Sequence, residues 1–181
     1  MVEEIKKALQ KIEKTYLSYP TVKGKLVNQE RVFAYEFYHQ IRNTIKSNLY
    51  VSGETKKGIA IASSGDTSIY PDIIIHDFGI NKNNSVAIEI KATSNLKAKS
   101  ILSDLEKLLL LSKEPFHYPH LIFLAVNCDL KAKINNSKAY GKQILELKEK
   151  NPNQMFWNIN SKQTENKTNK EKIKAKEIIE L

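Results

Sequence analysis

The sequence predicts an α/β protein in which helices pack against a central sheet. Two aliphatic segments of strand length, 72–77 and 85–92, are separated by glycine and asparagine residues that favour a chain reversal. Apolar residues recur at three- and four-residue spacing in 29–47 and in 97–112, as on the buried face of a helix. A nearly continuous apolar run at 120–127 is typical of a central strand buried on both faces.

Length and composition indicate one globular domain with a tail. A chain of 181 residues can bury one hydrophobic core, and 41% apolar with 27% charged residues is typical of a folded protein. We expect the domain to cover 1–160 and a polar, Lys-rich tail to cover 161–181. Within the tail, 161–172 is low in apolar residues and is expected to be flexible. The final segment, IKAKEIIEL, favours a short helix that docks on the core or on a second copy in a homodimer.

No feature of the sequence predicts secretion or membrane insertion. The N-terminal segment is charged and amphipathic, and no run of eighteen apolar residues occurs, so we expect a cytoplasmic protein without a membrane partner. The single cysteine, Cys128, excludes a disulfide within the chain and a four-cysteine iron–sulfur cluster. His117 and His120 lack the further ligands of a zinc site, so we interpret them as loop residues.

The first two helices are expected at 2–17 and 29–47. The first ends before Pro20, and Asn28 stands at the N-cap position of the second. Five apolar residues of the second helix form one stripe, which predicts the face that packs on the sheet. The stripe consists of Phe33, Ala34, Phe37, Ile41 and Ile45. Strand-forming residues follow within 49–63.

Charged side chains gather at one end of the hairpin that is predicted next. Because side chains alternate along a strand, Glu89 and Lys91 share one face. The aliphatic residues that alternate with them, Ile88 and Ile90, then point into the core. Antiparallel pairing would set Asp72 roughly opposite Lys91, with the charged groups about 5 to 8 Å apart. Two carboxylates this close repel each other, and a bound hard cation, Mg²⁺ first, is the simplest relief.

Three further elements are expected after the hairpin. Helix 97–112 should turn its apolar stripe inward and its charged residues outward. The inward residues are Ile101, Leu105, Leu108 and Leu109, and the outward ones are Lys97, Lys99, Asp104 and Lys107. Residues 137–150 are expected to be helical, and 155–160 to form an edge strand or a packing segment.

A Pro-Asp pair and a Glu-x-Lys triplet together carry a resemblance to a known superfamily. Pro71-Asp72 is the single Pro-Asp of the chain and directly precedes a strand, with 73–88 between it and Glu89. Glu-x-Lys occurs five times, but only at Glu89 does it lie within an aliphatic strand. The combination resembles the PD-(D/E)XK phosphodiesterase superfamily, which has the restriction-endonuclease-like fold. Over about 28–127, the resemblance implies an αβββαβ core around a mixed central sheet, with extra N- and C-terminal helices outside it.

The resemblance also implies a metal-dependent nuclease, with DNA favoured over RNA as the substrate. Asp72 and Glu89 would bind Mg²⁺ or Mn²⁺, and the main-chain carbonyl of Ile90 would add an oxygen ligand. Lys91 would orient the attacking water and offset charge in the transition state. Because little chain remains for a separate recognition structure, an endonuclease of repair, recombination or defence is favoured over a large restriction enzyme.

Members of this superfamily often have a further carboxylate on the first core helix. We assign this role to Glu30, which falls within the apolar stripe, whereas Glu36 lies on its flank. A buried carboxylate on that face would need a compensating partner. In the simpler interpretation, Glu30 is favoured at the helix start by the helix dipole alone.

Simpler interpretations exist for the other site residues as well. Asp72 can open its strand as a turn residue, while Glu89 and Lys91 form a solvated pair on a wet sheet face. The fold would then be a non-catalytic module that binds nucleic acid or a protein partner. The net charge of +9 is concentrated in the flanks, because 61–130 holds 6 basic and 8 acidic residues. Basic flanks suit a polyanionic substrate, although the lysine-rich composition that an AT-rich genome produces explains them equally well.

Overall fold

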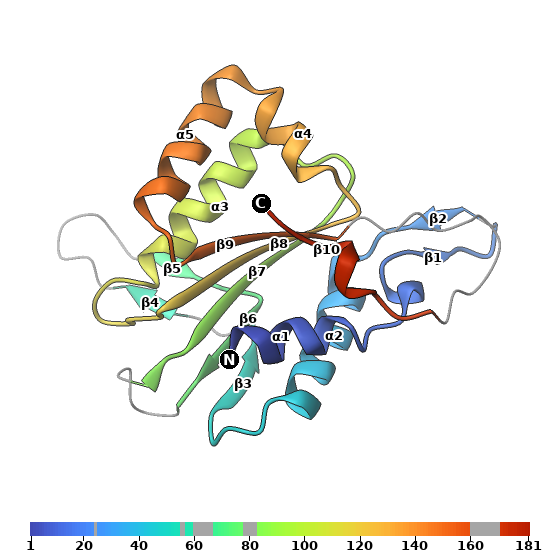
Figure 1. The fold of residues 1–181 in the computed structure, drawn as a ribbon, viewed down its shortest axis with the longest axis horizontal. Coiled ribbons are helices and arrows are strands. Elements are labelled where there is room, and N and C mark those ends of the chain that lie inside the picture. The colour runs from blue at the N-terminus through green and yellow to red at the C-terminus, as the bar shows by residue number, and fades with distance from the viewer. Residues whose placement is uncertain (24, 55–56, 60–66, 78–82, 160–170) are drawn as a thin grey trace.

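The computed structural model describes residues 1–23, 25–54, 57–59, 67–77, 83–159 and 171–181. Over these residues the protein is an α/β structure with one six-stranded mixed sheet and helices on both of its faces (Figure 1). The predicted α/β class and the mixed sheet are therefore confirmed. No helix among the described residues is long and apolar enough to cross a membrane.

The sheet has the strand order β10-β9-β8-β7-β6-β3. Its strands are β3 (Tyr50–Gly53), β6 (Ile73–His76), β7 (Val86–Ala92), β8 (His120–Val126), β9 (Gln154–Ile159) and β10 (Ile178–Glu180). The central strands β7, β8 and β9 are parallel, and the remaining neighbours pair antiparallel. Strands buried on both faces read as continuous apolar runs, which explains why β6, β7 and β8 were readable from the sequence.

Helices cover the two faces of the sheet unequally. α1 (Val2–Leu9) and α2 (Glu30–Thr44) pack on one face, while α3 (Ala98–Leu110), α4 (Leu130–Asn135) and α5 (Lys138–Lys150) pack on the other (Figure 1). Side-chain alternation divides the core accordingly. Ile88 and Ile90 belong to the cluster under α1 and α2, whereas Ala87 belongs to the cluster under α3. In the predicted stripe, Phe33, Phe37 and Ile41 are buried, whereas Ala34 and Ile45 are partly buried against the same cluster and Ile45 follows the end of α2.

Parallel strands require crossover connections, and these place the remaining helices. α3 connects β7 to β8, and α4 with α5 connects β8 to β9. Two small two-stranded sheets lie outside the main sheet, β1 (Tyr19–Pro20) with β2 (Leu26–Val27) and β4 (Lys57–Ile59) with β5 (Thr67–Ile69). Two short 3₁₀ helices, η1 (Lys14–Tyr16) and η3 (Ala175–Glu177), complete the described elements.

The N-terminal helix ends at Leu9, and the prediction that it continues to residue 17 is wrong. Contacts with the C-terminal segment replace the last helical turns. The backbone N–H of Lys14 donates to the carbonyl of Glu171, and the N–H of Ile173 donates to the carbonyl of Ile12. The predicted N-cap is also wrong, because Gln29 is the N-cap of α2 and the Asn28 side chain accepts a hydrogen bond from Asn127.

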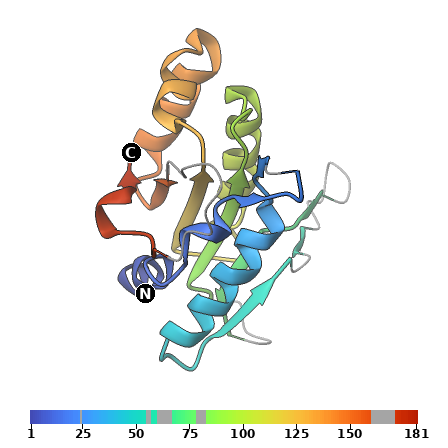
Figure 2. The same ribbon diagram turned by 90° about the vertical axis from the view of Figure 1, so that its right-hand side faces the viewer.

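The C-terminal segment forms a strand, and the prediction of a short helix from IKAKEIIEL is wrong apart from the single turn of η3. β10 pairs with β9, so the segment predicted as an edge strand lies one position inside the sheet. Nζ of Lys6 on α1 lies 3.1 Å from Oε2 of Glu180, and the C-terminal segment lies beside α1 (Figure 2). The predicted flexible stretch 161–172 lies mostly outside the described residues, and the division at residue 160 stays a prediction.

The junction of α4 and α5 gives a sharp test of the packing. A side chain at Gly141 would overlap the carbonyl oxygen of Ile134, so α5 can approach α4 only with glycine there. We expect Gly141→Ala to lower the free energy of unfolding by about 1–3 kcal/mol, the usual cost of overpacking. Alanine is the better helix former by about 1 kcal/mol, so helix propensity alone predicts the opposite sign.

Urea-induced unfolding measures this difference. The control is Lys142→Ala, an exposed position of the same helix, which should change the unfolding free energy by less than about 0.5 kcal/mol. A Gly141→Ala protein more stable than the wild type would contradict the close approach of the two helices.

Candidate active site

Asp72 lies opposite Glu89 across the β6–β7 hairpin. Ile73 pairs with Ile88, and continuing this register by one residue places Asp72 opposite Glu89. The prediction that Asp72 lies opposite Lys91 is therefore wrong by two positions. A two-residue shift keeps every side chain on its predicted face, so the alternation of apolar and polar residues could not distinguish the two registers.

Proline at position 71 ends the hydrogen-bond ladder between β6 and β7. The same register sets Pro71 opposite Ile90, and proline has no N–H to donate to the Ile90 carbonyl. The N–H of Ile90 donates to Oδ2 of Asp72 at 2.6 Å. Two residues further along the same edge of β7, the N–H of Ala92 donates to Oε2 of Glu30 at 3.0 Å. N–H and C=O groups alternate along this edge of β7, so the Ile90 carbonyl lies between the N–H groups of Ile90 and Ala92. It therefore points toward the space between the carboxylates of Asp72 and Glu30.

Glu89 and Lys91 occupy the opposite face of β7, under α3. Nζ of Lys91 lies 2.6 Å from Oε1 of Glu89 and 3.5 Å from Oδ2 of Asp104. The exposed fractions of these side chains are 17% for Glu89, 22% for Lys91 and 15% for Asp104, so the group is largely buried. A wet sheet face would leave them far more exposed.

Asp104 is the residue that the sequence interpretation missed. It was predicted to face outward, but it lies beside Lys91 and also contacts Lys107 at 3.6 Å. Its position in the sequence carried a signal, because Asp104 comes three residues after the buried Ile101 and directly before the buried Leu105. An acidic residue at the border of a buried stripe is a candidate partner for a buried lysine.

Burial dominates the electrostatics of the two carboxylates. Burial raises the pKa of Asp72 to about 6, although the Ile90 N–H and the Lys91 charge act against it. Burial and the neighbouring charge of Asp72 raise the pKa of Glu89 to about 7. Burial alone would lower the pKa of Lys91, but the charges of Glu89 and Asp104 outweigh it and raise the pKa. The site therefore holds one firmly protonated lysine and more acidic groups than that lysine can neutralise.

The donor atoms of this site fit a hard divalent cation. Mg²⁺ commonly binds through one or two carboxylates and keeps several waters, and Asp72, Glu89 and the Ile90 carbonyl supply this kind of oxygen set. Within the described ranges, no three His, Cys, Asp or Glu side chains are grouped closely enough to hold a metal by themselves. An ion at this position would accordingly depend on main-chain and water oxygens.

The two glutamates considered on α2 have different surroundings. Glu30 reaches the edge of β7, as its bond to Ala92 shows, and it borders the same cavity as Asp72. Glu36 instead accepts a hydrogen bond from Gln40 at 2.7 Å on its own helix. Glu30 also lies in the first turn of α2, where the helix dipole favours a carboxylate. Its assignment to the metal site stays a prediction.

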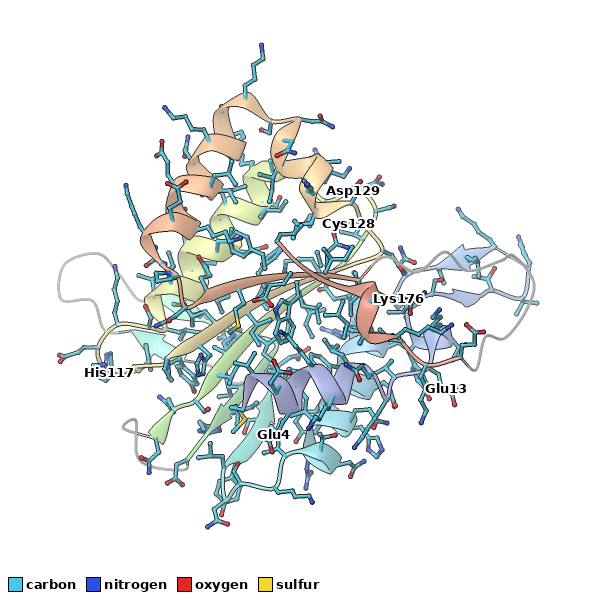
Figure 3. The ribbon with its side chains drawn as sticks, viewed as in Figure 1. Glu4, Glu13, His117, Cys128, Asp129 and Lys176 are labelled. Atoms are coloured by element: carbon cyan, nitrogen blue, oxygen red, sulfur yellow. The ribbon has the colours of Figure 1, made fainter. Side chains whose placement is uncertain are left out.

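Histidine and cysteine do not form a second metal site among the described residues. His117 lies in a loop at one end of the sheet and Cys128 at the opposite end, just before α4 (Figure 3). Burial raises the pKa of the Cys128 thiol to about 11, so the thiol stays protonated at neutral pH. His120 begins β8 and is not a loop residue, which corrects its predicted position.

The chain matches no protein-family model, and neither a curated protein nor a solved structure gives a significant match. Its function has to be inferred from the geometry and chemistry of the site.

The raised carboxyl pKa values predict a dependence of stability on pH. The pKa of Glu89 is 4.5 in the ordinary case and about 7 in the folded protein. Between these pH values the folded protein therefore binds more protons than the unfolded chain. Stability should therefore fall as the pH rises through this window. Glu89→Gln should reduce the total loss of stability across this window by on the order of 3 kcal/mol, since each pKa unit corresponds to about 1.4 kcal/mol.

Urea-unfolding free energies measured between about pH 4 and pH 8 in metal-free buffer test this expectation. Glu106→Gln, on the exposed side of α3, is the matched control and should keep the wild-type slope. Equal slopes for wild type and Glu89→Gln would show that Glu89 is not the group that titrates.

Proposed function

We propose that the protein is a metal-dependent phosphodiesterase that cleaves DNA. The observation that carries this proposal is the pair of partly buried, adjacent carboxylates Asp72 and Glu89 beside the protonated Lys91. Adjacent buried carboxylates with raised pKa values are typical of functional sites, because such an arrangement destabilises the fold unless a ligand compensates it.

The order and arrangement of elements support the same proposal. α2, β3, β6, β7, α3 and β8 follow one another as helix, three strands, helix and strand, with α2 and α3 on opposite faces. This is the order expected of the PD-(D/E)XK superfamily, with β4 and β5 inserted between the first two strands. Pro71 and Asp72 stand directly before the second strand of this series, and Glu89 and Lys91 lie on the third.

Each site residue has a definite task in phosphodiester hydrolysis. Asp72, Glu89 and the Ile90 carbonyl would hold Mg²⁺ or Mn²⁺, which when bound polarises a phosphoryl oxygen and lowers the pKa of water. The Lys91 ammonium would donate a hydrogen bond to the attacking water and offset the negative charge that develops on the phosphoryl oxygens. Asp104 would hold Lys91 in place from α3, since the two lie 3.5 Å apart.

The charge distribution supports a polyanionic substrate. The acidic residues of the site lie in the stretch 61–130, whereas 131–181 carries 12 basic and 6 acidic residues. Lysines outside an acidic metal site can contact phosphates without competing for the cation. One alternative remains, a module of this fold that binds nucleic acid or a protein partner without cleaving.

Substitution of the two carboxylates tests the proposal directly. We expect the purified protein to cleave DNA only with Mg²⁺ or Mn²⁺, and Asp72→Asn and Glu89→Gln each to lower the cleavage rate by at least about a thousandfold. Both changes keep the shape of the side chain and remove the charge that recruits the cation.

Cleavage is measured on single-stranded, duplex and branched DNA with each metal and with EDTA. The control is Glu106→Gln, which should cleave like the wild type, and circular dichroism should show all variants folded. Metal-dependent cleavage that survives in Asp72→Asn would place the chemistry elsewhere, and a protein that binds DNA without any cleavage would support the non-catalytic alternative.

Glu30 and Glu36 form a matched pair for a second test. Glu30→Gln should lower the cleavage rate by about a hundredfold, because its carboxylate borders the same strand edge as Asp72. Glu36→Gln should leave the rate within about twofold of wild type, since the Glu36 carboxylate accepts a hydrogen bond from Gln40 of the same helix. The reverse pattern, measured in the same cleavage assay, would rule out Glu30 as the helix-borne carboxylate of the site.

A further inference from the structure

A cavity with aromatic walls opens directly beside Asp72. It lies between α2 and the β3–β6 side of the sheet and has a volume of about 650 Å³, which is within the range of pockets for small ligands. Its wall contains Tyr35 and Tyr38 from α2 and Tyr70 from the segment before β6. Asp72 and Glu30 border the same cavity, so whatever occupies it is next to the site described above.

Two of these tyrosines are not used by the fold. Tyr35 is 64% exposed and Tyr70 is 53% exposed, which is unusual for large aromatic side chains. Tyr38, in contrast, is held in place, because its hydroxyl donates to the carbonyl of Val51 at 3.0 Å and Arg42 stacks on its ring. Exposed aromatic rings that border a cavity are suited to stacking on a flat ring system.

The charge of the cavity decides which part of a nucleic acid can enter. Among the described residues, three carboxylates border it, those of Glu30, Glu54 and Asp72, against the cation Arg31. Away from a bound cation, phosphate groups would be repelled from such a surface, whereas a nucleobase is neutral and carries amino groups that donate hydrogen bonds to carboxylates. Arg31 lies 3.8 Å from Glu54 at the exposed rim, where the backbone of an entering strand would pass.

We propose that this cavity binds one unpaired nucleobase, so that the substrate is single-stranded or locally unpaired DNA. The inference rests on the proposed phosphodiesterase function and specifies its substrate class. A base inside a duplex is stacked on both faces and paired along one edge, so it cannot lie between Tyr35 and Tyr70. With the base held there, the adjacent phosphate of the strand is next to Asp72.

Binding measured without cleavage tests the proposal. A fluorescein-labelled 15-nucleotide single strand and the duplex of the same sequence are titrated with the protein in EDTA, and binding is followed by fluorescence anisotropy. We expect the single strand to bind at least about tenfold more tightly than the duplex. Tyr35→Ala and Tyr70→Ala should each weaken single-strand binding about tenfold, the size of one lost stacking contact, and leave duplex binding unchanged.

Matched variants separate stacking from other effects. Tyr70→Phe keeps the ring and should bind like the wild type. Tyr50→Ala removes a tyrosine that is 49% exposed on β3 but is not among the described residues bordering the cavity, and it should also bind like the wild type. The substituted tyrosines are exposed, so unfolding midpoints should stay within the error of the wild type.

Two outcomes would overturn the inference, and they differ in what they say about the function. Equal affinity for single strand and duplex, unchanged in Tyr35→Ala and Tyr70→Ala, would reject the base pocket while leaving Asp72-dependent cleavage untouched. Failure to bind either form at low salt, together with no cleavage in Mg²⁺, would reject both the base pocket and the phosphodiesterase function.

Discussion

The site depends on the point at which the ladder between β6 and β7 stops. Pro71 has no N–H to donate to the Ile90 carbonyl, the ladder ends at this point, and the N–H groups on this edge of β7 from here on bond to side chains. Asp72 and Glu30 accept from two of these N–H groups, at Ile90 and Ala92. Carboxylates from two separate elements thus meet one strand edge, and the carbonyl oxygen of Ile90, which proline leaves without a donor, faces them.

This arrangement opposes the stability of the fold. Burial raises the pKa of Asp72 and of Glu89, and the charge of Asp72 adds to the shift of Glu89, which means that folding works against their charged forms. Lys91 relieves part of this, but it is shared between Glu89 and Asp104. A bound divalent cation would relieve the remainder, so the same repulsion that opposes folding would strengthen metal binding.

The two faces of the sheet divide the proposed work between them. The charged group of Glu89, Lys91 and Asp104 lies under α3, whereas the aromatic cavity lies on the side of α2. Tyr70 and the residues after it connect the two, since Tyr70 borders both the large cavity and a smaller one lined by Glu89 and Asp104. A DNA strand that passes Tyr70 would place a base in the aromatic cavity and a phosphate near Glu89, Lys91 and Asp104.

Local patterns of the sequence determined the elements themselves and the faces of their side chains. The stripe of α2, the buried run of β8 and the opposite orientations of Glu89 and Ile90 follow from periodicities of 3.6 and 2 residues, which act within one element. Contacts between distant segments decided the rest. Four features depend on which surfaces meet in the folded protein. They are the register opposite Asp72, the partner of Asp104, the end of α1 at Leu9 and the strand β10. A shift by two residues, or a segment paired with another part of the chain, leaves local periodicity unchanged, and for this reason only the tertiary structure could determine them.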